Sequence, residues 1–288
     1  MLWLPFALAN AFFESVVNAF TKRGAQKIDT LSVIWSHRFY SLFILLPLAL
    51  WQRAFVAVPS QFWLVALVST SLGFMANILF VKSVRQAPLS LVLPITAFSP
   101  AFLLVTSPLL IGEIPPFMGI IGVLMIVVGS YILNLTKRHE GFFEPLLAIP
   151  KEAGSRMMLL ATIIWSITSN LDKVAIRLSN PLFYALMGGV VVVINMSILL
   201  VIMRRSMRAI LKHYKMLAPI GIAAGFSLAA QMTAISMTIV PNAISVKRTS
   251  TLFGAVWGKL FFKEEKFRER ILGAVIMVLG VIVITIGS

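Results

Sequence analysis

The chain has 288 residues, of which 59% are hydrophobic and 12% charged, and its formal net charge is +15. Soluble domains carry about 25% charged residues, so this composition excludes a water-soluble fold and, with it, a basic nucleic-acid-binding domain. The absence of cysteine excludes disulfides, thiol catalysis and cysteine metal sites, and the three histidines are too scattered to share a metal ion. We therefore expect a membrane protein without cofactor or metal, whose positive charge lies in loops beside the lipid.

Apolar runs of about 20 residues, the length that crosses a bilayer, predict ten transmembrane helices in this sequence. In chain order they cover residues 2–21, 31–50, 61–82, 88–111, 115–135, 157–176, 181–203, 215–238, 241–262 and 268–287. The first run is too long for a secretory signal peptide and nine more follow it. We expect an integral multi-pass protein of the cell (inner) membrane.

One connection, residues 136–156, is longer than the others and mixes apolar with charged residues. It is interpreted as an interfacial linker, with a disordered loop as the alternative. Lysine and arginine gather in every second connection, whereas the other face has little beyond Arg53, Lys173 and Arg177. The positive-inside rule assigns the basic connections to the cytoplasm and places both chain ends outside.

The second half of the chain repeats the first. At an offset of 151 residues, identical residues coincide at Lys22 and Lys173, Glu113 and Glu264, Gly122 and Gly273, and Gly129 and Gly280; at 152, Gly73-Phe74 falls on Gly225-Phe226. Each half holds five predicted helices, and an odd number inverts the second copy in the membrane. Inverted repeats are typical of secondary transporters, whose site lies between the halves near the midplane. The sequence thus predicts an all-α membrane protein with two inverted five-helix repeats, 1–135 and 157–288, joined by the linker 136–156.

Two sets of motifs carry a family resemblance. In the first half they are Gln86-Ala87-Pro88-Leu89-Ser90, Gly112-Glu113, Gly119, Gly122 and Gly129, and in the second Val240-Pro241-Asn242-Ala243-Ile244-Ser245, Lys263-Glu264-Glu265, Gly273 and Gly280. Together they resemble the EamA repeat of the drug/metabolite transporter superfamily, over essentially the whole chain. The resemblance implies a ten-helix carrier with a central cavity. The superfamily moves amino acids, nucleotide sugars, phosphorylated sugars, cations and drugs.

Charged residues inside the predicted helices are the most informative, because each costs about 2.5–3.5 kcal/mol at the centre of a spanning helix. Glu14 belongs to a polar face of the first helix that includes Asn10, Asn18 and Thr21. It is expected at a depth similar to that of Arg38, so the two can pair. An inert buried ion pair is one interpretation; exchange of a proton or a substrate ammonium group by Glu14 is the other.

His37, beside Arg38 on the second helix, is interpreted as a helix-packing or interfacial residue. Lys247 and Arg248 lie roughly 10 Å below the surface where the ninth helix begins. They either snorkel back to that surface or line a cavity with neighbouring hydroxyls such as Thr251. The adjacent pair also resembles that of the plastid phosphate translocators, where it holds phosphate or carboxylate. Counting Arg38, Lys247 and Arg248 against Glu14 gives the membrane region a net charge of about +2, which favours an anionic substrate group.

Four further polar residues complete the predicted cavity, although ordinary interhelical hydrogen bonding is the alternative for each. They are Asn77, Thr96, Tyr184 and Gln231. The full predicted binding site is Lys247, Arg248, Thr251, Glu14, Asn18, Arg38, Asn77, Thr96, Gln231 and Tyr184. Three prolines, Pro94, Pro100 and Pro108, should kink the helix 88–111, whereas 241–262 has only an initial Pro241.

These residues predict a secondary transporter of a small anionic or zwitterionic metabolite, such as an amino acid, an organic acid or a phosphorylated compound, by alternating access. Its partners would be that substrate, the lipid bilayer and, through Glu14, protons. A flippase for a lipid-linked phosphate remains an alternative. So does a membrane-embedded enzyme acting on a phosphorylated lipid, although no acid/base constellation stands beside the cations and no nucleotide-binding motif occurs. A purely structural membrane subunit is the third class.

Overall fold

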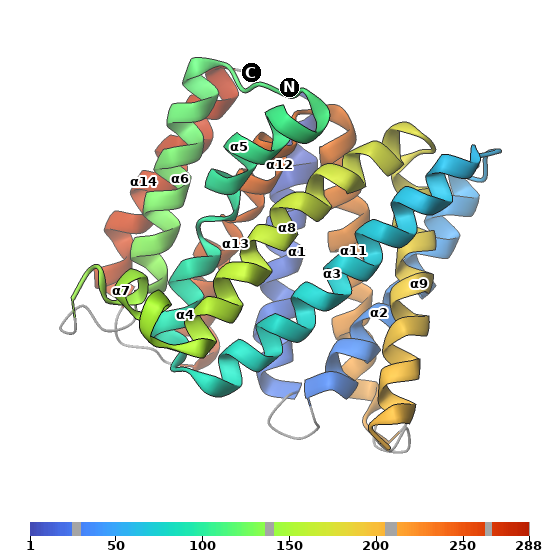
Figure 1. The fold of residues 1–288 in the computed structure, drawn as a ribbon, viewed down its shortest axis with the longest axis horizontal. Coiled ribbons are helices and arrows are strands. Elements are labelled where there is room, and N and C mark those ends of the chain that lie inside the picture. Colours follow the sequence, from blue (N-terminus) through green and yellow to red (C-terminus); the bar gives the residue numbers. More distant parts are fainter. Residues whose placement is uncertain (25–29, 136–140, 205–211, 263–266, 288) are drawn as a thin grey trace.

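The computed structural model describes residues 1–24, 30–135, 141–204, 212–262 and 267–287. In these ranges the regular elements are all helices (Figure 1). The first half contains α1 (Trp3–Gly24), α2 (Thr30–Trp51), α3 (Ser60–Gln86), α4 (Leu89–Thr96), α5 (Ser99–Ile111) and α6 (Phe117–Asn134). After α7 (Glu144–Lys151), the second half contains α8 (Ala153–Arg177), α9 (Pro181–Ile202), α11 (Tyr214–Met237), α12 (Val240–Lys247), α13 (Ser250–Phe262) and α14 (Phe267–Ile286).

Seven helical stretches in the described ranges are long and apolar enough to cross a membrane. They are Ser32–Trp51, Ser60–Gln86, Ser90–Ile111, Phe117–Asn134, Ala153–Arg177, Pro181–Ile202 and Tyr214–Met237. The other expected spans correspond to α1, which carries the polar face, to α12 with α13, which are interrupted by two cations, and to α14, whose apolar part Ile271–Ile286 is short. The chain is thus an all-α multi-pass membrane protein.

Two of the predicted helices are broken at equivalent positions of the repeat. α4 and α5 are separated at Ala97-Phe98, and α12 and α13 at Arg248-Thr249, which lie 151 residues further on. Pro94 precedes the first break, as the sequence predicted.

No proline lies beside the second break, so the search for proline in the sequence did not predict it. Two hydroxyls bond to backbone carbonyls beside this break: Thr249 donates to the Val246 carbonyl at 2.7 Å, and Thr251 donates to the Arg248 carbonyl at 2.9 Å. Side-chain hydroxyls that bond back to the preceding turn bend helices.

Equivalent helices of the two halves make equivalent contacts. α3 packs against α8 as α11 packs against α1, while α6 and α14, which are equivalent in the repeat, pack against each other (Figure 1). α1 begins and α14 ends at the same edge of the molecule. This arrangement brings α1, α8, α11 and α12 together in the middle of the bundle.

The repeated glycines form the contact between α6 and α14. A Cβ placed on Gly122 would lie 2.7 Å from the Gly280 carbonyl oxygen, and one on Gly129 would lie 2.6 Å from that of Gly273. Small residues permit this close approach of two membrane helices. The glycine repeat therefore has a packing role.

Another glycine pair is not equivalent in the two halves. A Cβ on Gly225 of α11 would lie 2.9 Å from the Ser41 carbonyl oxygen of α2, whereas one on Gly73 of α3 would have no atom of the described residues within 4 Å. Hence α11 packs tightly on α2, and the equivalent face of α3 at Gly73 is open.

The described part of the linker, from residue 141 onward, is largely helical. In α7, Pro145 and Ala148 are buried, while Leu147 and the preceding Phe143 are 60% and 61% exposed. Exposed apolar side chains beside charged ones are what an interfacial segment requires. Residues 136–140 of the linker lie outside the described ranges.

Candidate functional site

Five charged side chains from four helices face one another in the middle of the bundle. We call them the central charged cluster: Glu14 of α1, Arg38 of α2, Asp172 of α8, Lys247 of α12, and Arg248 at the break after α12. The charges of Lys247 and Arg38 act on both carboxylates, and Glu14 acts on Arg248. All five side chains are only half-buried.

Glu14 does not form the ion pair that its depth suggested. The single hydroxyl hydrogen of Ser227 of α11 is shared between Glu14 Oε2 at 3.1 Å and Asn10 Oδ1 at 2.9 Å. This bond turns the carboxylate toward α11. Among the described residues, no ion pair within 4.0 Å joins Glu14 to Arg38, which forms no hydrogen bond through its side chain there.

Asp172 is a charged residue of the candidate site that the sequence interpretation missed. One carboxylate oxygen, Oδ1, accepts a hydrogen bond from Ser69 of α3 at 2.5 Å and a second from the hydroxyl of Tyr184 of α9. Tyr184, a predicted site residue, thus reaches the site through Asp172. With Asp172 included, the three cations face two carboxylates, and the net charge of about +2 expected from the sequence becomes about +1.

The signal for Asp172 was present in the sequence. The residue lies inside the predicted span 157–176. The neighbouring Lys173 and Arg177 were assigned to the side of the membrane opposite the basic connections, and Asp172 was overlooked with them. A carboxylate inside a predicted span should always be counted, because it is costly there.

Lys247 and Arg248 point to other helices instead of snorkelling to the surface. Lys247 donates to Gln231 Oε1 of α11 at 2.8 Å. Arg248 donates to Ser99 Oγ of α5 through Nε at 3.1 Å and through a terminal nitrogen at 2.5 Å. Both hydrogen-bond partners are neutral, and among the described residues neither cation has a carboxylate within 4.0 Å.

Ser99 and Ser250 begin the second parts of the two broken helices, so the N-termini of α5 and α13 lie beside Arg248. Helix N-termini carry partial positive charge and unpaired N–H groups. Broken helices that present such ends at the centre of a membrane protein are the usual way to hold an anionic group there.

The remaining predicted site residues form no hydrogen bond to a side chain of the central charged cluster among the described residues; Thr251 reaches only the backbone carbonyl of Arg248. Thr96 donates to the Leu93 carbonyl of its own helix, and Thr251 also contacts Met277 Sδ of α14 at 3.7 Å. Asn77 is half-buried, with no hydrogen bond through its side chain among the described residues, and Asn18 is exposed.

His37 and Thr21 form a separate contact between α1 and α2. The Thr21 hydroxyl lies 2.7 Å from His37 Nε2. The bond ties the two helices together, in line with the helix-packing role expected of His37.

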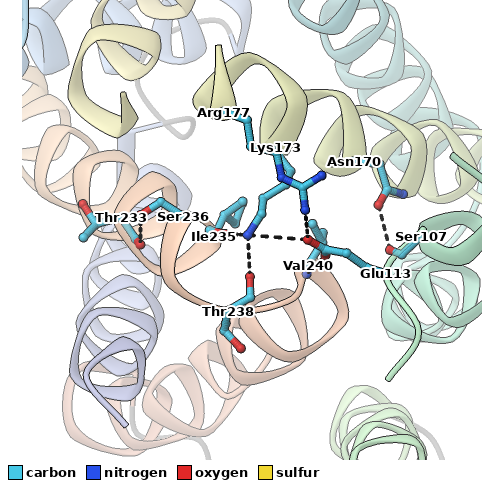
Figure 2. Close-up of polar contacts among 10 residues, drawn as sticks. All are labelled: Ser107, Glu113, Asn170, Lys173, Arg177, Thr233, Ile235, Ser236, Thr238 and Val240. Atoms are coloured by element: carbon cyan, nitrogen blue, oxygen red, sulfur yellow. Dashed lines mark hydrogen bonds and ion pairs between the residues drawn. The ribbon is translucent and has the colours of Figure 1, made fainter. Parts of the chain in front are cut away.

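A second group of charges lies at one end of the bundle, and its charges are paired (Figure 2). We call Glu113, Lys173 and Arg177 the Glu113 cluster. Arg177 donates to Glu113 Oε1 at 2.7 Å, and Lys173 Nζ lies 3.6 Å from the same oxygen. The other oxygen, Oε2, accepts the backbone N–H of Val240, at the start of α12, at 2.9 Å.

Lys173 is buried within the bundle rather than in a loop, being 6% exposed. Its ammonium group donates to the carbonyl oxygens of Ile235 at 2.5 Å and Thr238 at 2.8 Å, at the end of α11 (Figure 2). Carbonyls at a helix C-terminus have no partner in the helix and favour a cation. The cluster therefore ties the ends of α5, α8, α11 and α12.

Comparisons with known proteins agree with this arrangement. The model of the EamA-like transporter family matches residues 1–135 and again residues 153–286. An uncharacterized transporter of Archaeoglobus fulgidus is 20% identical over 285 residues, which cover 91% of this chain and 90% of that protein. A protein known from a crystal structure has the same fold, with a TM-score of 0.75, 13% identity and coverage of 97% of both chains.

Proposed function

The chain belongs to the EamA-like transporter family, within the drug/metabolite transporter superfamily, and on that premise we propose that it is a secondary carrier of small anionic or zwitterionic metabolites. It is a multi-pass membrane transporter and not an enzyme. The proposal includes ten membrane spans in two inverted five-helix repeats and an alternating-access cycle.

One observation carries the proposal: the central charged cluster contains five charges with no ion pair within 4.0 Å among the described residues. A charge removed from water without a partner costs several kcal/mol. These side chains are partly exposed, so water or a ligand can reach them. A site of this kind is suited to bind a charged substrate and to release it again.

The sign of the charge favours an anion. Three cations face two carboxylates, and the N-termini of α5 and α13 add partial positive charge. A carboxylate or phosphate group would accept hydrogen bonds from the guanidinium groups in a bidentate manner. Asp172 Oδ2 and Glu14 Oε1 accept no hydrogen bond among the described residues, which leaves room for the ammonium group of a zwitterion.

The unequal packing of the two halves supports alternating access. A carrier in one state holds its two repeats in different conformations. The tight contact of α11 with α2 at Gly225 and the open face of α3 at Gly73 are such a difference.

A thermal-shift screen of metabolites on the detergent-solubilised protein tests the proposal, because a bound ligand stabilises the folded form. We expect carboxylates, amino acids or phosphorylated compounds to raise the melting temperature of the wild type but not of the Lys247→Gln or Arg248→Gln variants. Stabilisation by anions that is unchanged in both variants would show that the site lies elsewhere.

A further inference from the structure

We propose that the Glu113 cluster is a gate, which closes one end of the transport path and must open once in each cycle. This inference depends on the proposed function, since only an alternating carrier needs a gate. Glu113 is a positioning residue in this account, because it acts on the substrate site through the helices that it holds.

The first support is that the cluster connects the two repeats. Glu113 lies in the connection between α5 and α6 of the first half, and all its partners, Lys173, Arg177 and the Val240 N–H, belong to the second half. Any movement of one repeat against the other at this end must break these contacts.

The second support is the link between the cluster and the central charges. Glu113 holds the first N–H of α12, and the same short helix ends at Lys247. Lys173 holds the last carbonyls of α11, the helix that carries Gln231, the partner of Lys247. Release of the cluster would therefore free the two helices that position Lys247.

The third support is that the cluster can open. Glu113 and Lys173 are buried, but Arg177 has a side chain that is 51% exposed, so water reaches the edge of the ion pair. Solvent-accessible ion pairs are weak and exchange readily with water.

Gly112 provides the turn that makes the contact. Its φ of 70° is left-handed, so the chain reverses after α5 and brings Glu113 back against α8 and α12. Within the repeat, Lys22 and Glu264 occupy the positions equivalent to Lys173 and Glu113. The side chains of Lys22 and Glu264 lie outside the described part of the structure.

Cysteine accessibility tests the gate directly, because the chain contains no cysteine and a single introduced thiol has no background. Ala234→Cys places a reporter on α11 between Gln231 and the cluster, where the native side chain is 1% exposed. Ser155→Cys places a matched reporter at the start of α8, where the native hydroxyl is buried and has no hydrogen-bond partner in the part of the chain that the structure describes, and the exchange is nearly isosteric.

We expect a charged thiosulfonate to modify the Ala234 thiol much faster than the Ser155 thiol even with Glu113 intact, because a gate opens spontaneously. Glu113→Gln should raise the Ala234 rate by about tenfold or more, as expected when a charged hydrogen bond of the closed state is lost, without changing the Ser155 rate. Glu264→Gln, the same change at the equivalent position of the repeat, should not raise the Ala234 rate.

A Glu113 cluster that never opens gives a different result. If the Ala234 thiol is as protected as the Ser155 thiol while Glu113 is intact, the cluster is not a gate. An equal rise at both reporters in Glu113→Gln also rejects the gate, because it reports general loosening. If Glu113→Gln fails to fold, Arg177→Gln removes only the exposed partner and should give a smaller rise at Ala234 alone.

The labelling needs no substrate, so its failure can be separated from failure of the proposed function. A protein that exchanges anions but keeps Ala234 protected lacks this gate. A protein that labels at Ala234 but binds no anion lacks the proposed substrate class.

Discussion

The central charged cluster and the Glu113 cluster use the same residue types in opposite ways. At one end of the bundle, Glu113 is paired with two cations, and its second oxygen accepts a backbone N–H. In the middle, cations and carboxylates are held by neutral partners such as Ser99, Gln231 and Ser227, without an ion pair within 4.0 Å among the described residues. Paired charges hold helices together, whereas charges positioned by neutral groups remain available to a ligand.

The largest expected effect is on stability in the Glu113 cluster. Lys173→Met should lower the free energy of unfolding by about 2–6 kcal/mol, because the Ile235 and Thr238 carbonyls lose this donor and a buried acceptor without a partner costs about 1–3 kcal/mol, while Arg177 still pairs with Glu113. Thermal unfolding in detergent measures this. Lys247→Met is the matched control. An equal loss of stability in both variants would contradict the claim that the Glu113 cluster holds the helices together more strongly than the central charged cluster does.

The next effect is on ligand binding by the central cations. Arg248→Gln and Lys247→Gln should each weaken binding of the substrate anion by about tenfold or more, since a charged hydrogen bond contributes about 1.5–3 kcal/mol. Equilibrium binding on solubilised protein measures the loss. Ser99→Ala, which removes only the neutral partner of Arg248, should have a smaller effect; a larger one would mean that the serine, and not the guanidinium, binds the ligand.

Asp172→Asn sharpens the assignment of the second carboxylate. The amide oxygen can still accept from Ser69 and Tyr184, so the variant should fold, but the net charge of the cluster rises by one. We expect affinity for a zwitterion to fall by about threefold or more relative to the matched simple anion, because one favourable charge contact is lost. Tyr184→Phe keeps the charge and serves as control; identical ratios in wild type and Asp172→Asn would remove Asp172 from the site.

The smallest effect on substrate exchange is expected for Glu14→Gln. Glu14 has one described hydrogen-bond donor, Ser227, and is the group we expect to carry a proton. The variant should lose the stimulation of uptake by a pH gradient while keeping exchange of a simple anion at equal pH. Uptake assays at matched and unmatched pH make this measurement, and unchanged stimulation would separate Glu14 from coupling.

Much of the fold could be predicted because apolar periodicity and the internal repeat are properties of the sequence. The helix positions, the inward orientation of Lys247 and Arg248 and the equivalence of α6 and α14 follow from such signals. The break after Arg248 could not be predicted from proline, because hydroxyl groups accompany it.

The hydrogen-bond partner of a charged side chain was harder to predict than its depth in the membrane. Helical rise places Glu14 and Arg38 at similar depths, but which neighbour a carboxylate turns to depends on the helix packed beside it. Here α11 brings Ser227 to Glu14. Asp172 was missed for a related reason, since only the tertiary structure shows that it turns toward Ser69 and Tyr184 while the adjacent Lys173 turns toward α11.

Counterflow in liposomes tests the central claim most directly. Vesicles loaded with an unlabelled carboxylate, amino acid or phosphorylated compound from the thermal-shift screen should accumulate the labelled form through the wild type, and those containing Arg248→Gln should do so far more slowly. Equal counterflow through both proteins, or none through a wild type that binds the same compound, would contradict the assignment of the central charged cluster as the carrier's substrate site.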